Sequence, residues 1–142
     1  MGSDEVKYLL DTGVWLRSVN EAQSIPGEVL KLLKVSNELY GLSAISLWEA
    51  GKKFQIGKLP LAMDLPGWFS EALAENLTLI PLTPEIVSDA MRLPDFPNRD
   101  PGDELIVATA RVNKLTLLTT DTKLKGYRHA RIQYFTPILA NP

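Results

Sequence analysis

Short, mainly apolar runs recur along the chain and are separated by longer segments of mixed character. Runs such as VKYLL and LTLLTT are apolar at neighbouring positions instead of at every second one. This pattern is typical of strands that are covered on both faces. We therefore predict five strands, over residues 6–10, 40–45, 77–82, 115–120 and 131–135.

The segments between these runs have the apolar spacing of amphipathic helices. In residues 27–37, apolar side chains recur every three or four positions, and Pro26 precedes the first turn. Asp64 and Thr83 stand where N-caps are expected, and Thr83 is followed by Pro84. The predicted helices cover residues 27–37, about 47–55, 66–77, 83–93 and 98–110.

Strands that alternate with helices favour a parallel sheet with right-handed crossovers and helices on both faces. We therefore predict an α/β fold, a three-layer α/β/α sandwich around a central, mostly parallel sheet of about five strands. The length of 142 residues suits one domain, and a hydrophobic share of 45% can build its core. No repeat or linker divides the chain, so we expect a single domain over residues 1–142.

Composition excludes several classes of protein. The chain has no cysteine, which excludes disulfides and thiolate metal sites. Its net charge of −2 differs from the strongly basic character of general nucleic-acid-binding domains. No apolar run approaches the roughly 20 residues of a membrane span, and the first ten residues lack the pattern of a signal peptide. We expect a cytoplasmic protein that does not enter a membrane.

Four acidic residues occupy comparable places, at the ends of predicted strands or near the starts of predicted helices. They are Asp11, Glu49, Asp103 and Asp121. The carboxyl ends of parallel strands meet at one edge of a sheet, where ligands bind. Carboxylates that converge there repel one another unless a cation compensates, and Mg²⁺ or Mn²⁺ prefers such oxygen ligands. The lack of cysteine and the single histidine, His129, argue against zinc.

Each of these acids also has a purely structural interpretation. SLWE matches a capping box in which Ser46 is the N-cap, and DPGD resembles one that begins at Asp100. Asp11 and Asp121 stand where turn residues hydrogen-bond to their own backbone. Helix capping does not require the acids to share one edge of the sheet, whereas a metal site does. The positions of the four carboxylates therefore distinguish the structural interpretation from the metal site.

Four motifs occur in a characteristic order: LLDTGVWL, SLWEAGKKFQIGKLPL, RDPGDELIVATA and LLTTD. With them the chain resembles the PIN-domain nucleases over nearly its whole length, and among them the VapC-type toxins of prokaryotic toxin–antitoxin pairs. The resemblance implies a metal-dependent endoribonuclease that hydrolyses RNA phosphodiester bonds with water activated by Mg²⁺ or Mn²⁺. It also implies two protein contacts, one with a small antitoxin and one within a homodimer.

The resemblance assigns both catalysis and metal binding to four carboxylates, which are Asp11, Glu49, Asp103 and Asp121. Neighbours expected to support them are Thr12, Asp100 and Thr120. The chain departs from the family pattern near these acids. Relatives often carry His at the position of Gly13, and often read HRDPFDR or HRDPADR where this chain has Asn98, Gly102 and Glu104. These departures affect the surroundings of the four acids and leave the acids themselves in place.

Basic and aromatic residues near the motifs are candidates for contact with RNA. The basic residues that could contact the RNA backbone are Lys52, Lys53, Lys123 and Arg128. Further candidates for this contact are Lys58, Lys125 and Arg131. Trp15, Trp48 and Trp68 are candidates for base stacking. We interpret Trp48 as a core residue, Trp68 with Phe69 as a partner surface, and His129 as a surface or substrate-facing residue.

Two other functions remain compatible with the sequence. The motif LLDTG is compatible with a phosphatase that uses an aspartyl nucleophile. That class, however, needs a second acid at the position that Gly13 occupies here. A non-catalytic PIN-like module that binds RNA or a partner is the other alternative, although it has no use for mutually repelling carboxylates. The substitution Asp11→Asn separates the two hypotheses, because it would abolish cleavage if the protein is an enzyme and would leave binding untouched if it is a binding module.

Overall fold

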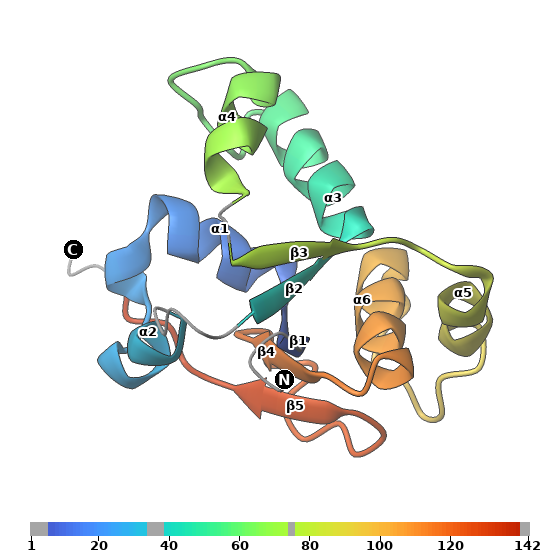
Figure 1. Ribbon diagram of the computed structural model, residues 1–142. Helices are drawn as coiled ribbons and strands as arrows, with labels where there is room; N and C mark the ends of the chain where they lie inside the picture. Colours follow the sequence, from blue (N-terminus) through green and yellow to red (C-terminus); the bar gives the residue numbers. More distant parts are fainter. Residues whose placement is uncertain (1–5, 34–38, 74–75, 140–142) are drawn as a thin grey trace.

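A five-stranded sheet forms the centre of the protein, in the order β3-β2-β1-β4-β5 (Figure 1). The computed structural model describes residues 6–33, 39–73 and 76–139. All four pairs of neighbouring strands are parallel, which confirms the predicted fold class. The strands are β1 (Val6–Leu10), β2 (Leu39–Ser43), β3 (Leu77–Ile80), β4 (Thr116–Thr119) and β5 (Arg131–Tyr134).

Six α-helices and one 3-10 helix are present among the described residues. They are α1 (Thr12–Asn20), η2 (Ala22–Ser24), α2 (Gly27–Leu33), α3 (Ala44–Gln55), α4 (Leu65–Ala72), α5 (Pro84–Ala90) and α6 (Pro101–Val112). None of these described helices is both long enough and apolar enough to cross a bilayer.

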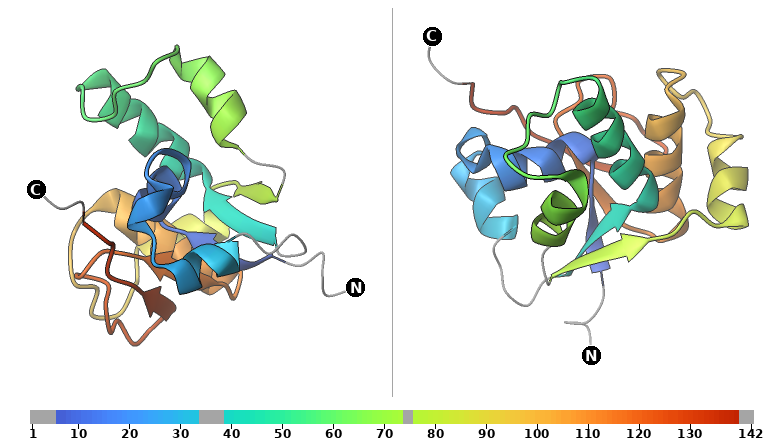
Figure 2. Two further views of the ribbon diagram at one scale, coloured as in Figure 1. Left: turned by 90° about the vertical axis from the view of Figure 1, so that its left-hand side faces the viewer. Right: turned by 90° about the horizontal axis from the view of Figure 1, so that it is seen from above.

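Helices cover both faces of the sheet, with α1 and α2 on one side and α6 and α5 on the other (Figure 2). Leu10 and Leu118 face the first side, where α1, α2 and α4 complete the core. Their neighbours Leu9 and Leu117 face α6 on the second side. Successive strand residues point to opposite faces, so a sheet covered twice buries all of them. This is why the strands appear in the sequence as apolar runs.

Several element boundaries differ from the predicted ones. Helix α1 was not predicted, because its sequence contains glycine and β-branched residues that disfavour helix formation. It forms because Asp11 caps its first turn and its buried side chains pack against the sheet. The helix predicted over residues 66–77 ends at Ala72. The helix predicted over 27–37 is α2, and residues 34–37 of that prediction lie outside the described residues.

Other local predictions are confirmed. The side chain of Asp64 accepts a hydrogen bond from the backbone N–H of Gly67 and caps α4. Thr83 accepts one from the backbone N–H of Ile86 and caps α5, with Pro84 at the first helical position. Such caps involve residues within three positions of each other, so a sequence pattern is sufficient to predict them.

Candidate active site

The four predicted acids meet at the carboxyl edge of the sheet. Asp11 directly follows β1, and its backbone N–H donates to the carbonyl oxygen of Leu118 in β4 at 3.0 Å. Asp121 lies two residues beyond the end of β4. Helix α6 contributes Asp103 from its first turn, and α3 contributes Glu49 from its second turn. The fold thus brings together residues from four separate segments.

The pKa of Asp103 shows how crowded these carboxylates are. It is raised from 3.8 to about 7. Burial of the carboxyl group is the largest cause, and the negative charges of Asp11, Asp100, Asp121 and Glu49 add to it. Because such repulsion requires proximity, these five residues form one group, which we call the acidic cluster. Helix capping alone would not produce this convergence.

Asp11 is the most deeply buried member of the acidic cluster, with 8% of its surface exposed. Burial raises the pKa of its carboxyl group, against the opposing effect of two hydrogen bonds. The Thr119 hydroxyl donates to Oδ2 at 2.6 Å, and the backbone N–H of Thr12 donates to Oδ1 at 2.8 Å. Thr119 also accepts a hydrogen bond from the backbone N–H of Asp121, at 3.0 Å. The supporting hydroxyl therefore belongs to Thr119, one residue before the predicted Thr120.

Glu49 is held by Thr12, one of the residues expected to support the acids. The Thr12 hydroxyl donates to Oε1 of Glu49 at 2.5 Å and is also hydrogen-bonded to the Ser46 hydroxyl at 2.7 Å. The predicted capping box is wrong, because Ser43 is the N-cap of α3 and Ser46 is buried one turn further on. Burial is the largest cause of the raised pKa of Glu49, and the charge of Asp11 adds to it.

The start of α6 combines a helix cap with a close approach of α3. Asp100 is confirmed as the N-cap, since its Oδ1 accepts from the backbone N–H groups of Gly102 and Asp103 at 2.8 and 3.3 Å. Asn98 donates to Asp103 Oδ2 at 3.1 Å, so this departure from the family pattern supports an acid of the cluster. A Cβ atom at Gly102 would collide with the Glu49 carboxylate. The glycine therefore allows Glu49 to approach α6.

The predicted RNA-binding residues lie at different distances from the acidic cluster. Burial raises the pKa of both Asp11 and Glu49, and the positive charge of Lys53 opposes this slightly, so Lys53 lies within electrostatic range of both acids. Lys123 is exposed, and its backbone N–H donates to Asp121 Oδ1 at 2.9 Å. Lys52 belongs to the exposed side of α3, where its Nζ lies 5.7 Å from the centre of the Trp48 ring.

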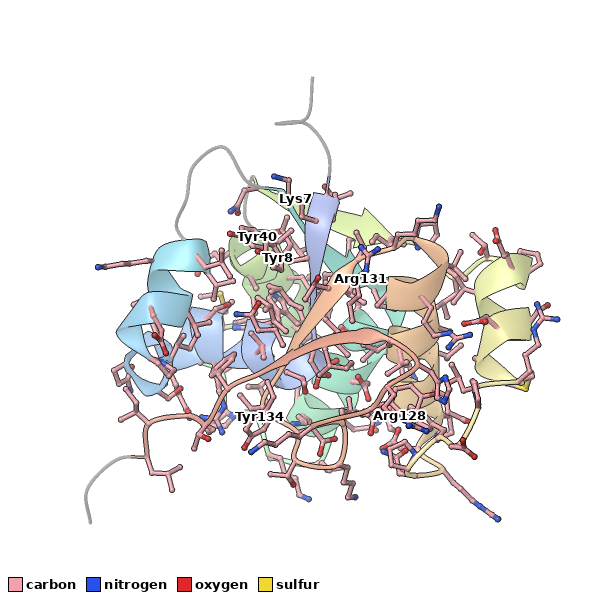
Figure 3. All side chains as sticks on the ribbon, turned by 90° about the horizontal axis from the view of Figure 1, so that it is seen from below. Lys7, Tyr8, Tyr40, Arg128, Arg131 and Tyr134 are labelled. Atoms are coloured by element: carbon pink, nitrogen blue, oxygen red, sulfur yellow. The ribbon has the colours of Figure 1, made fainter. Side chains whose placement is uncertain are left out.

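Arg128 and Arg131, both labelled in Figure 3, line a different part of the surface. Arg131 begins β5 and pairs with Thr116, the first residue of β4, so it lies near the amino ends of the strands. Both arginines line a hollow of about 630 Å³ together with Arg111 and Lys114. This hollow is separate from the acidic cluster. His129 is exposed, as expected, and its Nε2 lies 3.8 Å from Asp95.

The predicted roles of two tryptophans are reversed in the structure. Trp48, predicted to lie in the core, has 61% of its surface exposed. Trp68, predicted to face a partner, is 5% exposed and packs against the buried Trp15 with ring centres 5.3 Å apart. Trp48 lies on the exposed side of α3, whereas Trp68 lies on the buried side of α4. Phe69 is half-buried beside Trp68.

The chemistry of the acidic cluster suits a hard divalent cation. All of its side chains offer carboxylate oxygens, which Mg²⁺ and Mn²⁺ prefer. In the ranges that the structure describes, no three acidic or histidine side chains are arranged as a ready-made metal site. Asp11, Glu49 and Asp103 instead accept hydrogen bonds from Thr119, Thr12 and Asn98.

Comparison with known proteins agrees with this architecture. The pattern of the PIN domain family matches residues 8–130. Ribonuclease VapC22 of Mycobacterium tuberculosis is 31% identical over 123 residues, which are 87% of this chain and 93% of that relative.

Among solved structures, VapBC2 from Rickettsia felis bound to a promoter DNA fragment has a TM-score of 0.71 at 17% identity, covering 92% of this chain and 99% of that one. FitAcB from Neisseria gonorrhoeae has a TM-score of 0.62 at 21% identity, covering 88% and 95%. At these identities the structures show a shared fold. The chain therefore belongs to the PIN domain family, as one of its VapC-type members.

Proposed function

We propose that this protein is a metal-dependent endoribonuclease and the toxin of a toxin–antitoxin pair. The observation that carries the proposal is the convergence of the acidic cluster, in which burial and then the neighbouring negative charges raise the pKa of Asp103 to about 7. Crowded carboxylates destabilise a fold unless a cation neutralises them. Membership of the PIN domain family and the similarity to Ribonuclease VapC22 support RNA as the substrate.

In this proposal Mg²⁺ or Mn²⁺ is held by Asp11, Glu49, Asp103 and Asp121, with Asp11 and Asp103 as direct ligands. The bound ion lowers the pKa of water and stabilises negative charge on the phosphate that is attacked. Each carboxylate oxygen has two lone pairs, so an oxygen that accepts a hydrogen bond from Thr12 or Thr119 can still bind a metal.

The remaining residues orient these carboxylates and attract the RNA. Thr119 and Thr12 fix the carboxylate of Asp11 from two sides, and Asp100 fixes the first turn of α6. Lys53 brings a positive charge to the edge of the acidic cluster, where the RNA backbone would approach. We propose the same backbone contact for Lys52 and Lys123, and a more distant one for Arg128.

We also propose that a small antitoxin inhibits this protein by covering the acidic cluster, and that the protein forms a homodimer. The support for the antitoxin is that solved structures with this fold include toxin–antitoxin complexes. Sedimentation of the full chain tests the dimer, for which we expect twice the mass of one chain. A single-chain mass at about 100 µM would contradict the dimer, because the free energy of association would then be weaker than about −5.5 kcal/mol.

Cleavage of total cellular RNA by the full chain tests the proposed activity. We expect new RNA ends with 5′-phosphates in Mn²⁺ and none in EDTA. Asp103→Asn and Asp11→Asn should each reduce the rate at least about 100-fold, as expected for loss of a metal ligand. Glu104→Gln is the matched control, because it also removes a negative charge from the first turn of α6. RNA binding without cleavage by the wild type would instead support the non-catalytic module.

A further inference from the structure

Trp48 is unusually exposed for a tryptophan and directly precedes Glu49 in α3. Its exposed fraction is 61%, whereas Trp68 and Trp15 are 5% and 1% exposed. Trp48 is therefore not required for the packing of the core. An exposed indole next to a candidate active-site acid has a flat apolar face available for a ligand.

One side of Trp48 borders a hollow of about 580 Å³ that adjoins the acidic cluster. Two acids of the cluster, Glu49 and Asp100, form part of its wall. The rest of the wall is mostly apolar and consists of Ala44, Ile45, Trp48, Leu82, Pro101 and Gly102. A group bound there would lie beside whatever occupies the acidic cluster.

A positive charge also lies close to the indole. Lys52 is one helical turn after Trp48, and its Nζ lies 5.7 Å from the ring centre. A hydrogen bond of 2.7 Å from this Nζ to Gln55 Oε1 helps to hold the ammonium group in place. An aromatic ring with a neighbouring cation is the combination that binds single-stranded nucleic acid, because the ring stacks on a base and the cation contacts a phosphate.

We propose that Trp48 is a stacking site for one nucleobase of the RNA, next to the phosphate that lies at the acidic cluster. This inference rests on the proposed ribonuclease function and adds to it a residue that binds substrate. A nucleobase suits the hollow because its faces are apolar and it carries no charge, whereas an anionic group would be repelled by Glu49 and Asp100. The amino groups at the edges of bases can also donate hydrogen bonds to these carboxylates.

Binding of RNA octamers to variants of the full chain tests this inference. The probes are fluorescently labelled rA, rC and rU octamers in Ca²⁺, with fluorescence anisotropy as the readout of Kd. We expect Trp48→Ala to weaken binding of the preferred octamer about 5- to 140-fold, the range for loss of one stacked base. Trp48→Phe should retain most of the affinity, because a phenyl ring also stacks. The indole fluorescence of the wild type should decrease on binding.

Phe54→Ala is the matched control. Phe54 is another exposed aromatic residue of α3. It lines a second hollow, which Trp48 and Lys52 also border but which no residue of the acidic cluster lines, so it tests the other side of Trp48. We expect Phe54→Ala to bind the octamers as the wild type does. Circular dichroism and thermal melts should show that all three variants fold.

The outcomes separate this inference from the proposed function. A wild type that binds none of the octamers and cleaves no RNA would contradict both. Equal Kd values for the wild type and Trp48→Ala would overturn only the stacking site. The hollow would then be interpreted as a binding site for a segment of a protein partner. Equal losses in Trp48→Ala and Phe54→Ala, or in Trp48→Ala and Trp48→Phe, would also overturn it.

Discussion

Replacement of Asp103 by asparagine should stabilise the metal-free protein at alkaline pH. The folded protein keeps the Asp103 proton up to about pH 7, whereas in the unfolded chain the group ionises near its usual pKa of 3.8. Protonation therefore favours folding fully below pH 3.8, and this contribution is lost as the pH rises through 7. At pH 8 the folded wild type carries the full repulsion of the acidic cluster, which asparagine removes.

The size of this effect follows from the pKa. At 1.36 kcal/mol per pH unit, the difference between 3.8 and about 7 corresponds to at most about 4 kcal/mol. Asp103 is only partly buried, so solvent screening should reduce this to about 1–2 kcal/mol. Loss of a negative charge at the start of α6 opposes the gain by about 0.3–1 kcal/mol. The hydrogen bond from Asn98 can be kept, because the amide oxygen of asparagine also accepts one.

Thermal melts in EDTA at pH 4 and pH 8 measure the effect. For a chain of this length we expect Asp103→Asn to melt about 2–5 °C above the wild type at pH 8, and close to it at pH 4. The control Glu104→Gln, in the same helical turn, should melt slightly below the wild type at pH 8 because it loses only the helix-dipole interaction.

A lower melting temperature for Asp103→Asn than for the wild type at pH 8 would refute this reasoning. It would mean that the negative charge at Asp103 mainly stabilises α6 and that repulsion within the acidic cluster is weak. An equal gain at pH 4 and pH 8 would also refute it, because the effect would not follow the ionisation of the carboxyl group.

Three further predictions address the metal and its supporting residues. Mn²⁺ at about 100 times its Kd should raise the free energy of unfolding of the wild type by about 2.7 kcal/mol, and thermal melts of Asp103→Asn should show no such gain. Gly102→Ala should weaken Mn²⁺ binding in calorimetry with little change in melting temperature. The added Cβ displaces the Glu49 carboxylate, and the higher helix propensity of alanine offsets its tight contact with Oδ1 of the Asp100 cap; a large fall in melting temperature would contradict this. Thr119→Val should lower the free energy of unfolding in urea by about 1–3 kcal/mol, because the buried Asp11 loses a hydrogen bond. Thr120→Val is its control, and an equal loss in both variants would argue against a specific role for Thr119.

The sequence by itself determined the features of this protein that depend on short stretches of chain. Apolar runs predict the five strands, because a sheet with helices on both faces buries every strand residue. The caps Asp64, Thr83 and Asp100 are confirmed because each hydrogen bond spans only two or three residues. The four acids were proposed from their places next to strands and helices, and the parallel order of the strands brings them to one edge.

Contacts between distant segments of the chain follow only from the three-dimensional arrangement of its elements. The sequence pattern predicts Ser46 as the cap of α3, but the cap is Ser43, and Ser46 contacts Thr12, a residue 34 positions away. Trp48 lies at the surface, where the sequence interpretation placed it in the core. Likewise, Thr119 contacts Asp11 across 108 positions, and no local pattern distinguishes it from Thr120. Contacts between distant segments depend on how the helices pack on the sheet, and a single sequence does not contain that information.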